Sequence, residues 1–292
     1  MNHFGELLTA AITPFDKNGV VETDTFWRLC KKLVSEGSNG IVLTGTTGES
    51  PNLTESDRLN IYSTAKDAVG DNAKLIAGTG TYSTKETVTL TKLAEETGMD
   101  GVMIVTPYYN KPSQTGILKH FQEVMNNTNL PVMAYNIPGR TGTLIELETL
   151  CTLVRDIGVH SIKDAVGDFK FSLKELKELK NETYIYSGDD ALTLDFLKNG
   201  AVGVVSVASH VLGKQIRKMI DHSLSNEITN AEEIETIIMP LINALFEEPS
   251  PGAVKHLLTT SWENVGVPQL PMTAVSDELA KKLNDLYAKL NN

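Results

Sequence analysis

The sequence lacks the marks of a secreted or membrane protein. It has only 2 cysteines, Cys30 and Cys151, which stand far apart and outside any Cys-x-x-Cys pair. Neither a disulfide framework nor a cysteine-based metal site is expected, and we interpret both as small buried hydrophobic side chains. No apolar run approaches the roughly 18 residues of a membrane-spanning helix, and no cationic region followed by an apolar stretch opens the chain. We therefore expect a soluble, cytoplasmic protein.

The sequence also has few positively charged residues relative to negatively charged ones. Lys and Arg number 26 against 37 Asp and Glu, which gives a formal net charge of −11. Such a surface repels phosphate backbones and anionic lipid, so we expect no nucleic-acid or membrane partner. The sequence has no Gly-Lys-Ser/Thr ending of a P-loop, and Gly78-Thr79-Gly80 lacks the third glycine of a dinucleotide fingerprint. Nucleotide binding has no support in the sequence.

The 6 histidines form no recognisable pair of metal ligands. There is no His-Glu-x-x-His motif, no close Cys/His cluster and no Asp-rich calcium loop. We predict chemistry without a metal and without a cofactor, and we interpret His160 and His210 as structural.

What the sequence does contain is a regular alternation of two kinds of segment. Short apolar, β-prone runs occur at residues 7–13, 40–43, 74–77, 101–105, 132–135, 159–162, 184–186 and 202–207. Amphipathic stretches typical of helices lie between them, at 25–35, 55–69, 85–96, 116–126, 146–155 and 172–179. Eight strand and helix units of this size predict parallel strands joined by right-handed crossovers.

This repeat indicates the fold class, an α/β protein with a (β/α)8 TIM barrel. A doubly wound open sheet is the alternative, but it usually has fewer strands and a phosphate fingerprint after the first of them. Strand signals stop near residue 210, and 232–246, 253–260 and 276–290 look helical. We predict a catalytic barrel over residues 1–222 and a C-terminal helical appendage over 223–292.

In such a barrel the active site lies at the C-terminal ends of the strands. Lys163 closes one apolar run, and Tyr135 and Arg140 follow another. Residues 44–50, Thr-Gly-Thr-Thr-Gly-Glu-Ser, suit a carboxylate or a phosphate, because their backbone N–H groups and hydroxyls can donate to an anion. Taken alone this segment is as well explained as a strand-to-helix turn, and each side chain taken singly as a structural residue.

Lys163 suggests what chemistry the residues at the strand ends could perform together. A barrel mouth desolvates the ammonium of Lys163 and lowers its pKa, and a neutral amine attacks ketones to give a Schiff base and then an enamine. A phenol can pass protons to such an intermediate when a hydroxyl completes a relay, and Thr46 could supply that hydroxyl.

Several segments, in order along nearly the whole chain, resemble a known family. They are residues 9–15, 45–50, 78–80, 107–112, 135–142, Lys163, 187–190 and 203–207. The sequence is similar to the class I pyruvate aldolases related to N-acetylneuraminate lyase, and within them to the dihydrodipicolinate synthases.

The resemblance implies a role for each candidate residue. Lys163 forms the Schiff base with pyruvate, Tyr135 transfers protons, and Thr46 with Tyr109 from an adjacent subunit completes the relay. Thr47 holds the pyruvate carboxylate with help from the backbone at Val205 and Gly188. Arg140 holds the carboxylate of L-aspartate 4-semialdehyde, and a guanidinium does match a carboxylate in bidentate fashion.

The resemblance also implies the reaction and the assembly. The two substrates condense to 4-hydroxytetrahydrodipicolinate, the first committed step toward diaminopimelate and lysine, in a homotetramer built as a dimer of dimers. Lysine-inhibited relatives use two histidines and an asparagine at an allosteric site, where this chain has Glu55, Arg58 and Tyr82. We therefore predict weak or absent lysine feedback.

Three other functions compete with this interpretation. A sibling aldolase acting on N-acetylneuraminate or a 2-keto-3-deoxy sugar acid is the nearest, but Arg140 and Ser187-Gly188-Asp189-Asp190 favour the synthase. A keto-acid sensor without turnover has no need for Lys163, Tyr135, Thr46 and Tyr109 together. A scaffold leaves the strand-end residues unexplained.

Overall fold

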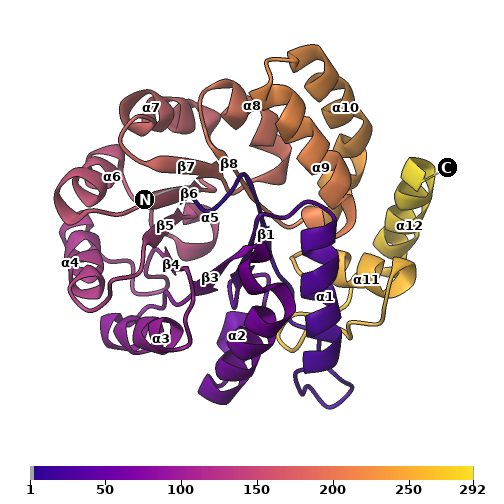
Figure 1. The fold of residues 1–292 in the computed structure, drawn as a ribbon, viewed down its shortest axis with the longest axis horizontal. Helices are drawn as coiled ribbons and strands as arrows, with labels where there is room; N and C mark the ends of the chain where they lie inside the picture. The colour runs from indigo at the N-terminus through magenta and orange to yellow at the C-terminus, as the bar shows by residue number, and fades with distance from the viewer. Residues whose placement is uncertain (1–2, 292) are drawn as a thin grey trace.

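The structure, a computed structural model that describes residues 3–291, is a closed barrel of eight parallel strands. The strands pair in chain order and β8 returns to β1 (Figure 1). Their bounds are β1 (Leu7–Ala10), β2 (Gly40–Leu43), β3 (Lys74–Gly78), β4 (Gly101–Val105), β5 (Val132–Asn136), β6 (Ser161–Asp164), β7 (Tyr184–Ser187) and β8 (Gly203–Ser206). The predicted fold class is confirmed.

The strands differ from the prediction mainly at their ends. β1 stops at Ala10 instead of residue 13, and β6 begins at Ser161 and includes Lys163. Lys163 pairs with Tyr135 on one side and Tyr186 on the other, so its backbone is part of the ladder on both sides. The lysine is thus held by the sheet itself and not by a loop.

Helices surround the barrel and connect its strands. They are α1 (Thr23–Ser35), α2 (Glu55–Val69), α3 (Thr84–Glu96), α4 (Gln114–Met125), α5 (Pro138–Thr141), α6 (Leu147–Thr152), α7 (Phe169–Leu179), α8 (Thr193–Lys198) and α9 (Ser209–Leu224). Side chains cap the first turns of α2, α3, α4 and α7, where the backbone N–H groups have no partner within the helix. Thr54 and Asp57 form a reciprocal capping box at the start of α2.

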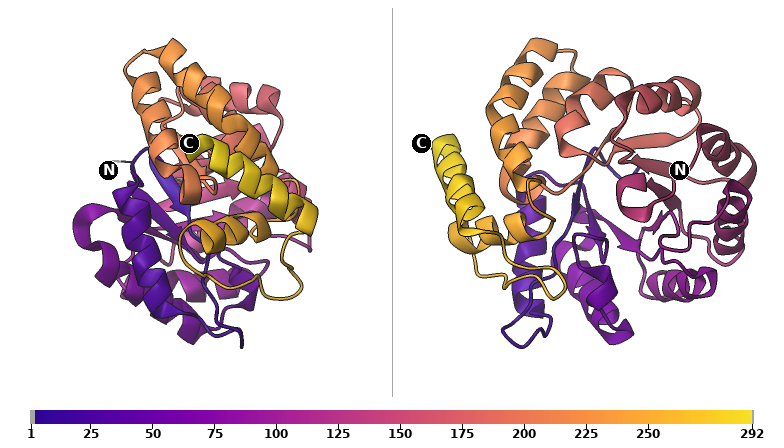
Figure 2. Two further views of the ribbon diagram at one scale, coloured as in Figure 1. Left: turned by 90° about the vertical axis from the view of Figure 1, so that its right-hand side faces the viewer. Right: turned by 180° about the vertical axis from the view of Figure 1, so that it is seen from behind.

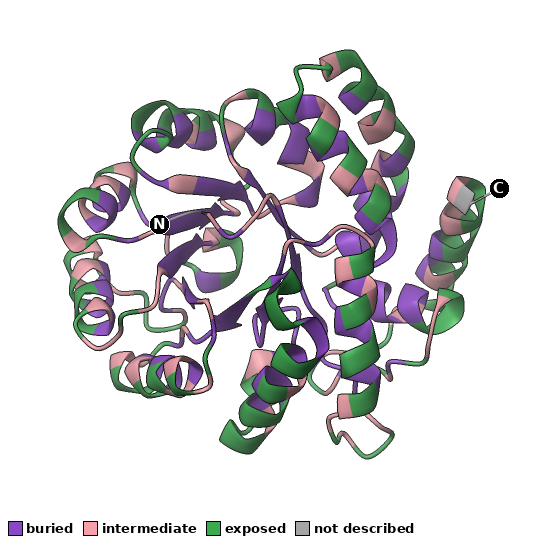
Figure 3. Ribbon diagram, viewed as in Figure 1, coloured by how far each residue is buried: buried purple, intermediate pink, exposed green. Residues whose placement is uncertain are grey.

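The apolar side chains form two separate cores. One lies inside the barrel and includes Leu8, Val42, Met133 and Tyr186. The larger one lies between the sheet and the helices, so each strand is buried on both faces while the outer helix faces are exposed (Figure 3). Continuous burial of this kind explains why the strands read as uninterrupted apolar runs.

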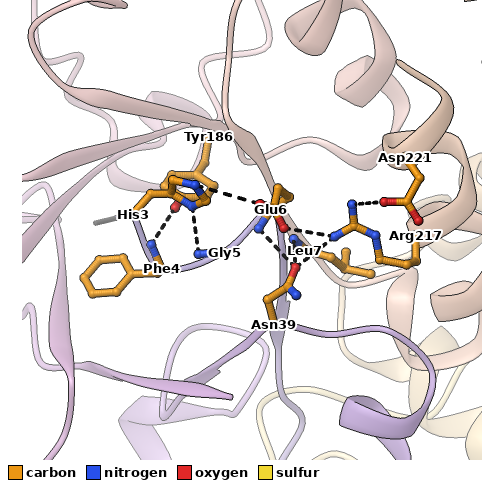
Figure 4. A network of polar contacts seen from close by, with 9 residues as sticks. All are labelled: His3, Phe4, Gly5, Glu6, Leu7, Asn39, Tyr186, Arg217 and Asp221. Atoms are coloured by element: carbon orange, nitrogen blue, oxygen red, sulfur yellow. Dashed lines mark hydrogen bonds and ion pairs between the residues drawn. The ribbon is translucent and has the colours of Figure 1, made fainter. Parts of the chain in front are cut away.

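A polar network closes the N-terminal face of the barrel (Figure 4). Asn39 Oδ1 accepts from the backbone N–H of Glu6 and of Leu7 and from Arg217. Arg217 also pairs with Glu6 at 3.1 Å, and the Phe4 N–H donates to the Tyr186 hydroxyl. The segment before β1 is therefore fixed across this end, which leaves the opposite end for binding and chemistry.

The three C-terminal helices lie outside the barrel ring, and α12 is the outermost (Figure 2). α10 (Ile228–Leu245) packs on α9 and α12, and α11 (Gly252–Ser261) packs on α9 and α12 (Asp277–Asn291). The division into domains at residues 222 and 223 stays a prediction, and it falls near the end of α9. None of the helices within residues 3–291 is long and apolar enough to cross a membrane.

Candidate active site

A cavity of about 230 Å³ opens at the C-terminal ends of the strands. Thr46, Tyr135 and Arg140, three of the residues predicted from the sequence, line it together. The remaining lining residues are Thr44, Gly45, Ser50, Pro51, Gly78, Gly80, Met103, Val105, Tyr108, Ile137 and Thr141. The cavity has the size of a small acid and the place expected of an active site in this fold.

Lys163 is not among the residues that line this cavity, but it is buried next to Tyr135, which does line it. Its side chain is 5% exposed, Nζ lies 4.2 Å from the centre of the Tyr135 ring, and the two residues pair across β5 and β6. Burial lowers the pKa of Lys163 to about 7, Asp190 opposes the change, and the positive charge of Arg140 adds to it. A large share of the amine is therefore neutral near pH 7 and available as a nucleophile.

Tyr135 remains a protonated phenol at neutral pH. Its side chain is 5% exposed, and burial raises its pKa to about 12, against a smaller lowering by Arg140. Arg140 itself is exposed, in the short helix α5 directly after β5. The pair thus presents a proton donor inside the cavity and a free guanidinium at its edge.

Gly188 directly follows β7, and Val205 lies on β8. A Cβ atom at Gly188 would lie 3.0 Å from Cε of Lys163 and 2.8 Å from Cβ of Ala165, so a side chain there would collide with the lysine. The Gly188 N–H donates to the Asp164 carbonyl at 2.6 Å. Val205 is buried in the inner core of the barrel. Gly188 therefore leaves room for Lys163.

The threonine loop, residues 44–50, carries Thr46 exposed at its surface and Thr47 buried beside it. Thr44 and Glu49 both adopt left-handed backbone angles, with φ of 51° and 58°. Each such non-glycine residue costs of the order of 1–3 kcal/mol and persists only where its surroundings fix it. Contacts do so here: Thr44 Oγ1 lies 3.1 Å from the Tyr62 hydroxyl, and Thr13 Oγ1 donates to the Gly48 carbonyl.

Tyr109 is not brought into the cavity of its own chain. It is 90% exposed, and its neighbour Tyr108 lines the cavity instead. The backbone of Tyr109 is also left-handed, with φ of 71°. A bulky aromatic side chain held outward in an uncommon conformation fits a role outside its own subunit.

Sequence reasoning missed Asp190, which is buried beside the site. Its carboxylate accepts from the Ser206 hydroxyl and from the backbone N–H of Val207 and Ala208, which fixes the turn after β8. The sequence does contain a signal for it, because Asp190 follows Asp189 just after a strand, within residues 187–190 of the family pattern. Residues 3–291 contain no group of three His, Cys, Asp or Glu side chains placed to hold a metal ion.

Arg58 is one of the three residues on which the prediction about lysine feedback rests. It is 5% exposed and donates to the Ser50 carbonyl and hydroxyl and to the Gly78 carbonyl. Tyr82 is 53% exposed and makes an edge contact with Tyr108. The guanidinium thus hydrogen-bonds to groups of the protein itself, and weak or absent lysine feedback stays a prediction.

Known proteins similar to this one match it over nearly its full length. The model of the dihydrodipicolinate synthetase family matches residues 3–290. The 4-hydroxy-tetrahydrodipicolinate synthase of Desulforudis audaxviator is 44% identical over 97% of this chain and 96% of that protein, and the Bacillus subtilis synthase is 41% identical over 99% and 100%. A crystal structure of a dihydrodipicolinate synthase from Bacillus anthracis superposes with a TM-score of 0.95 at 38% identity, covering 99% of each chain.

These matches confirm the resemblance found in the sequence. They extend over the barrel and the C-terminal helices alike, so they do not depend on the strand-end segments alone. The chain belongs to the dihydrodipicolinate synthetase family.

Proposed function

We propose that this chain condenses pyruvate with L-aspartate 4-semialdehyde through a Schiff base on Lys163. As a family member it is a lyase of the class I aldolase type, and its relatives place the reaction at the first committed step of diaminopimelate and lysine biosynthesis. The observation that carries the assignment of Lys163 is its buried amine, with a pKa of about 7, beside Tyr135, which lines the cavity. That is the environment a nucleophilic lysine needs.

The first half of the reaction follows from the two paired residues. Neutral Lys163 adds to the C2 carbonyl of pyruvate, and loss of water gives the Schiff base. Loss of a C3 proton then gives an enamine, the carbon nucleophile. Tyr135 is protonated and adjacent, so it supplies the proton that the departing hydroxyl needs and takes part in the later transfers.

The carboxylates of the two substrates go to different parts of the site. We assign the pyruvate carboxylate to Thr47, with the backbone at Val205 and Gly188, as the family resemblance implies; Gly188 lies directly against Lys163. We assign the carboxylate of the semialdehyde to Arg140, which is exposed at the edge of the cavity. The enamine carbon attacks the aldehyde, and the amino group of the second substrate then displaces Lys163 as the ring closes.

A second subunit completes the proton relay in this proposal. Thr46 is exposed in the cavity, and Tyr109 points away from its own chain. Exchange of the tyrosine across a two-fold interface places Tyr109 of the partner subunit against Thr46 and Tyr135. We propose a homotetramer formed as a dimer of dimers, in the cytoplasm.

The acceptor substrate is tested by pyruvate consumption with purified protein. One sample contains L-aspartate 4-semialdehyde and a matched sample contains N-acetylmannosamine. We expect loss of pyruvate with the semialdehyde alone, and Arg140→Gln should weaken that reaction by raising the KM for the semialdehyde. Loss with the sugar alone would move the protein to the sialic-acid side of the wider family.

A further inference from the structure

A buried ion pair joins the C-terminal helices to the threonine loop. Lys255 of α11 lies 2.6 Å from Glu49 through Nζ and Oε1, and both side chains are 1% exposed. The other carboxylate oxygen of Glu49 accepts from the backbone N–H of Gln269 at 2.6 Å. Nζ of Lys255 also donates to the Val267 carbonyl and lies 4.5 Å from the centre of the Phe15 ring.

Stability alone does not explain this pair. Two charges removed from water lose several kcal/mol of solvation each, and well-packed apolar side chains of the same volume are often as stable or more so. Loss of one partner alone is costly, because it leaves the other charge buried without compensation. A pair retained in such a place is better explained by what it positions.

Glu49 connects the pair to the substrate-binding residues. Its backbone is left-handed, and its N–H donates to the carbonyl of Thr46 at 3.0 Å. Thr47 and Gly48 lie between these two residues, so the direction of the turn fixes where both threonine hydroxyls point. A carboxylate that swung out toward water would release that turn.

We propose that Lys255 is a positioning residue that holds the Thr46–Thr47 turn in its binding conformation through Glu49. The C-terminal helices then take part in substrate binding although Lys255 does not contact the substrate. This inference rests on the proposed function of the site. A displacement of about 1 Å in a group that orients a substrate can lower activity by about 10²-fold, so the effect should be large.

The test compares three variants with wild-type protein and a matched control. The variants are Lys255→Met, Glu49→Gln and the double variant. The control is Leu283→Ala, which opens a cavity at a fully buried side chain of α12, a helix that packs on α10 and α11. For each protein we measure thermal unfolding and the pyruvate concentration that half-saturates the adduct trapped by borohydride.

We expect Lys255→Met to raise the half-saturating pyruvate concentration at least about tenfold, and Leu283→Ala to leave it within about twofold despite a lower Tm. The double variant has no unpaired buried charge, so it should regain thermal stability yet keep the weakened binding. It also gives the answer if Lys255→Met does not fold.

Two other results have distinct meanings. Wild-type binding in the double variant would overturn the inference, because the pair would then be structural only. Failure of wild-type protein to trap pyruvate at all would remove the proposed function, and the inference with it.

Discussion

The pH dependence of Schiff-base formation gives the most quantitative prediction. Burial lowers the pKa of Lys163 from 10.5 to about 7. A lysine with the unperturbed value is neutral in roughly one molecule in three thousand at pH 7, whereas Lys163 is neutral in about half. The protein environment therefore raises the concentration of the nucleophile by about 10³ at pH 7. The shift in pKa corresponds to roughly 5 kcal/mol, of which lost ammonium solvation is the largest cause.

The assay is the rate of adduct formation at low pyruvate concentration, trapped with borohydride between pH 5 and pH 9. Only the neutral amine reacts, so the rate should rise with pH and level off above about pH 7. Arg140 adds to the lowering of the pKa, so Arg140→Gln should move the midpoint to higher pH. A rate that keeps rising about tenfold per pH unit up to pH 9 would show an unperturbed lysine and refute the reasoning.

Three further predictions follow from other parts of the structure. Tyr109→Phe should lower turnover at least about tenfold with an unchanged Tm, because the substitution removes only the hydroxyl and keeps the ring; full turnover would rule out the relay. Burial, with Asp164 nearby, raises the pKa of Glu175 well above its usual value, so the folded protein keeps a proton that the unfolded chain releases above about pH 4.5. This group therefore makes stability fall as pH rises from there, and urea unfolding at pH 5 and pH 8 should show that Glu175→Gln reduces the fall; an unchanged pH dependence would contradict this. Millimolar lysine should leave the activity unchanged, because the Arg58 guanidinium is bonded to Ser50 and Gly78, and strong inhibition would contradict that expectation.

Much of the fold could be predicted from the sequence because each strand is buried on both faces. Continuous apolar runs with regular spacing indicate parallel strands, and eight of them with intervening helices indicate the barrel. The ends were harder to place. Lys163 reads as the residue after a strand because it is charged, but pairing with Tyr135 and Tyr186 keeps it within β6.

The sequence does not predict the shortest helices. α5 and α8 have four and six residues, which is too few for a helical period to appear in the sequence. α9 is long enough, but the non-helical angles at Leu212 interrupt it, so its apolar pattern does not follow one helical period.

Some residues of the candidate site could be predicted from the sequence and others could not. Lys163, Tyr135, Thr46 and Arg140 could be brought together from the sequence, because the carboxyl ends of parallel strands meet at one end of a barrel. The contact between Glu49 and Lys255 could not, since no strand register relates the C-terminal helices to the threonine loop. The role proposed for Tyr109 needs a second subunit, so a single chain cannot bring it to the site.

Peptide mapping of the borohydride-trapped protein tests the central claim most directly. Protein incubated with pyruvate, reduced and digested should carry the added mass on the peptide that contains Lys163, and Lys163→Arg should carry none. An adduct on another lysine, or no adduct in active wild-type protein, would contradict the account.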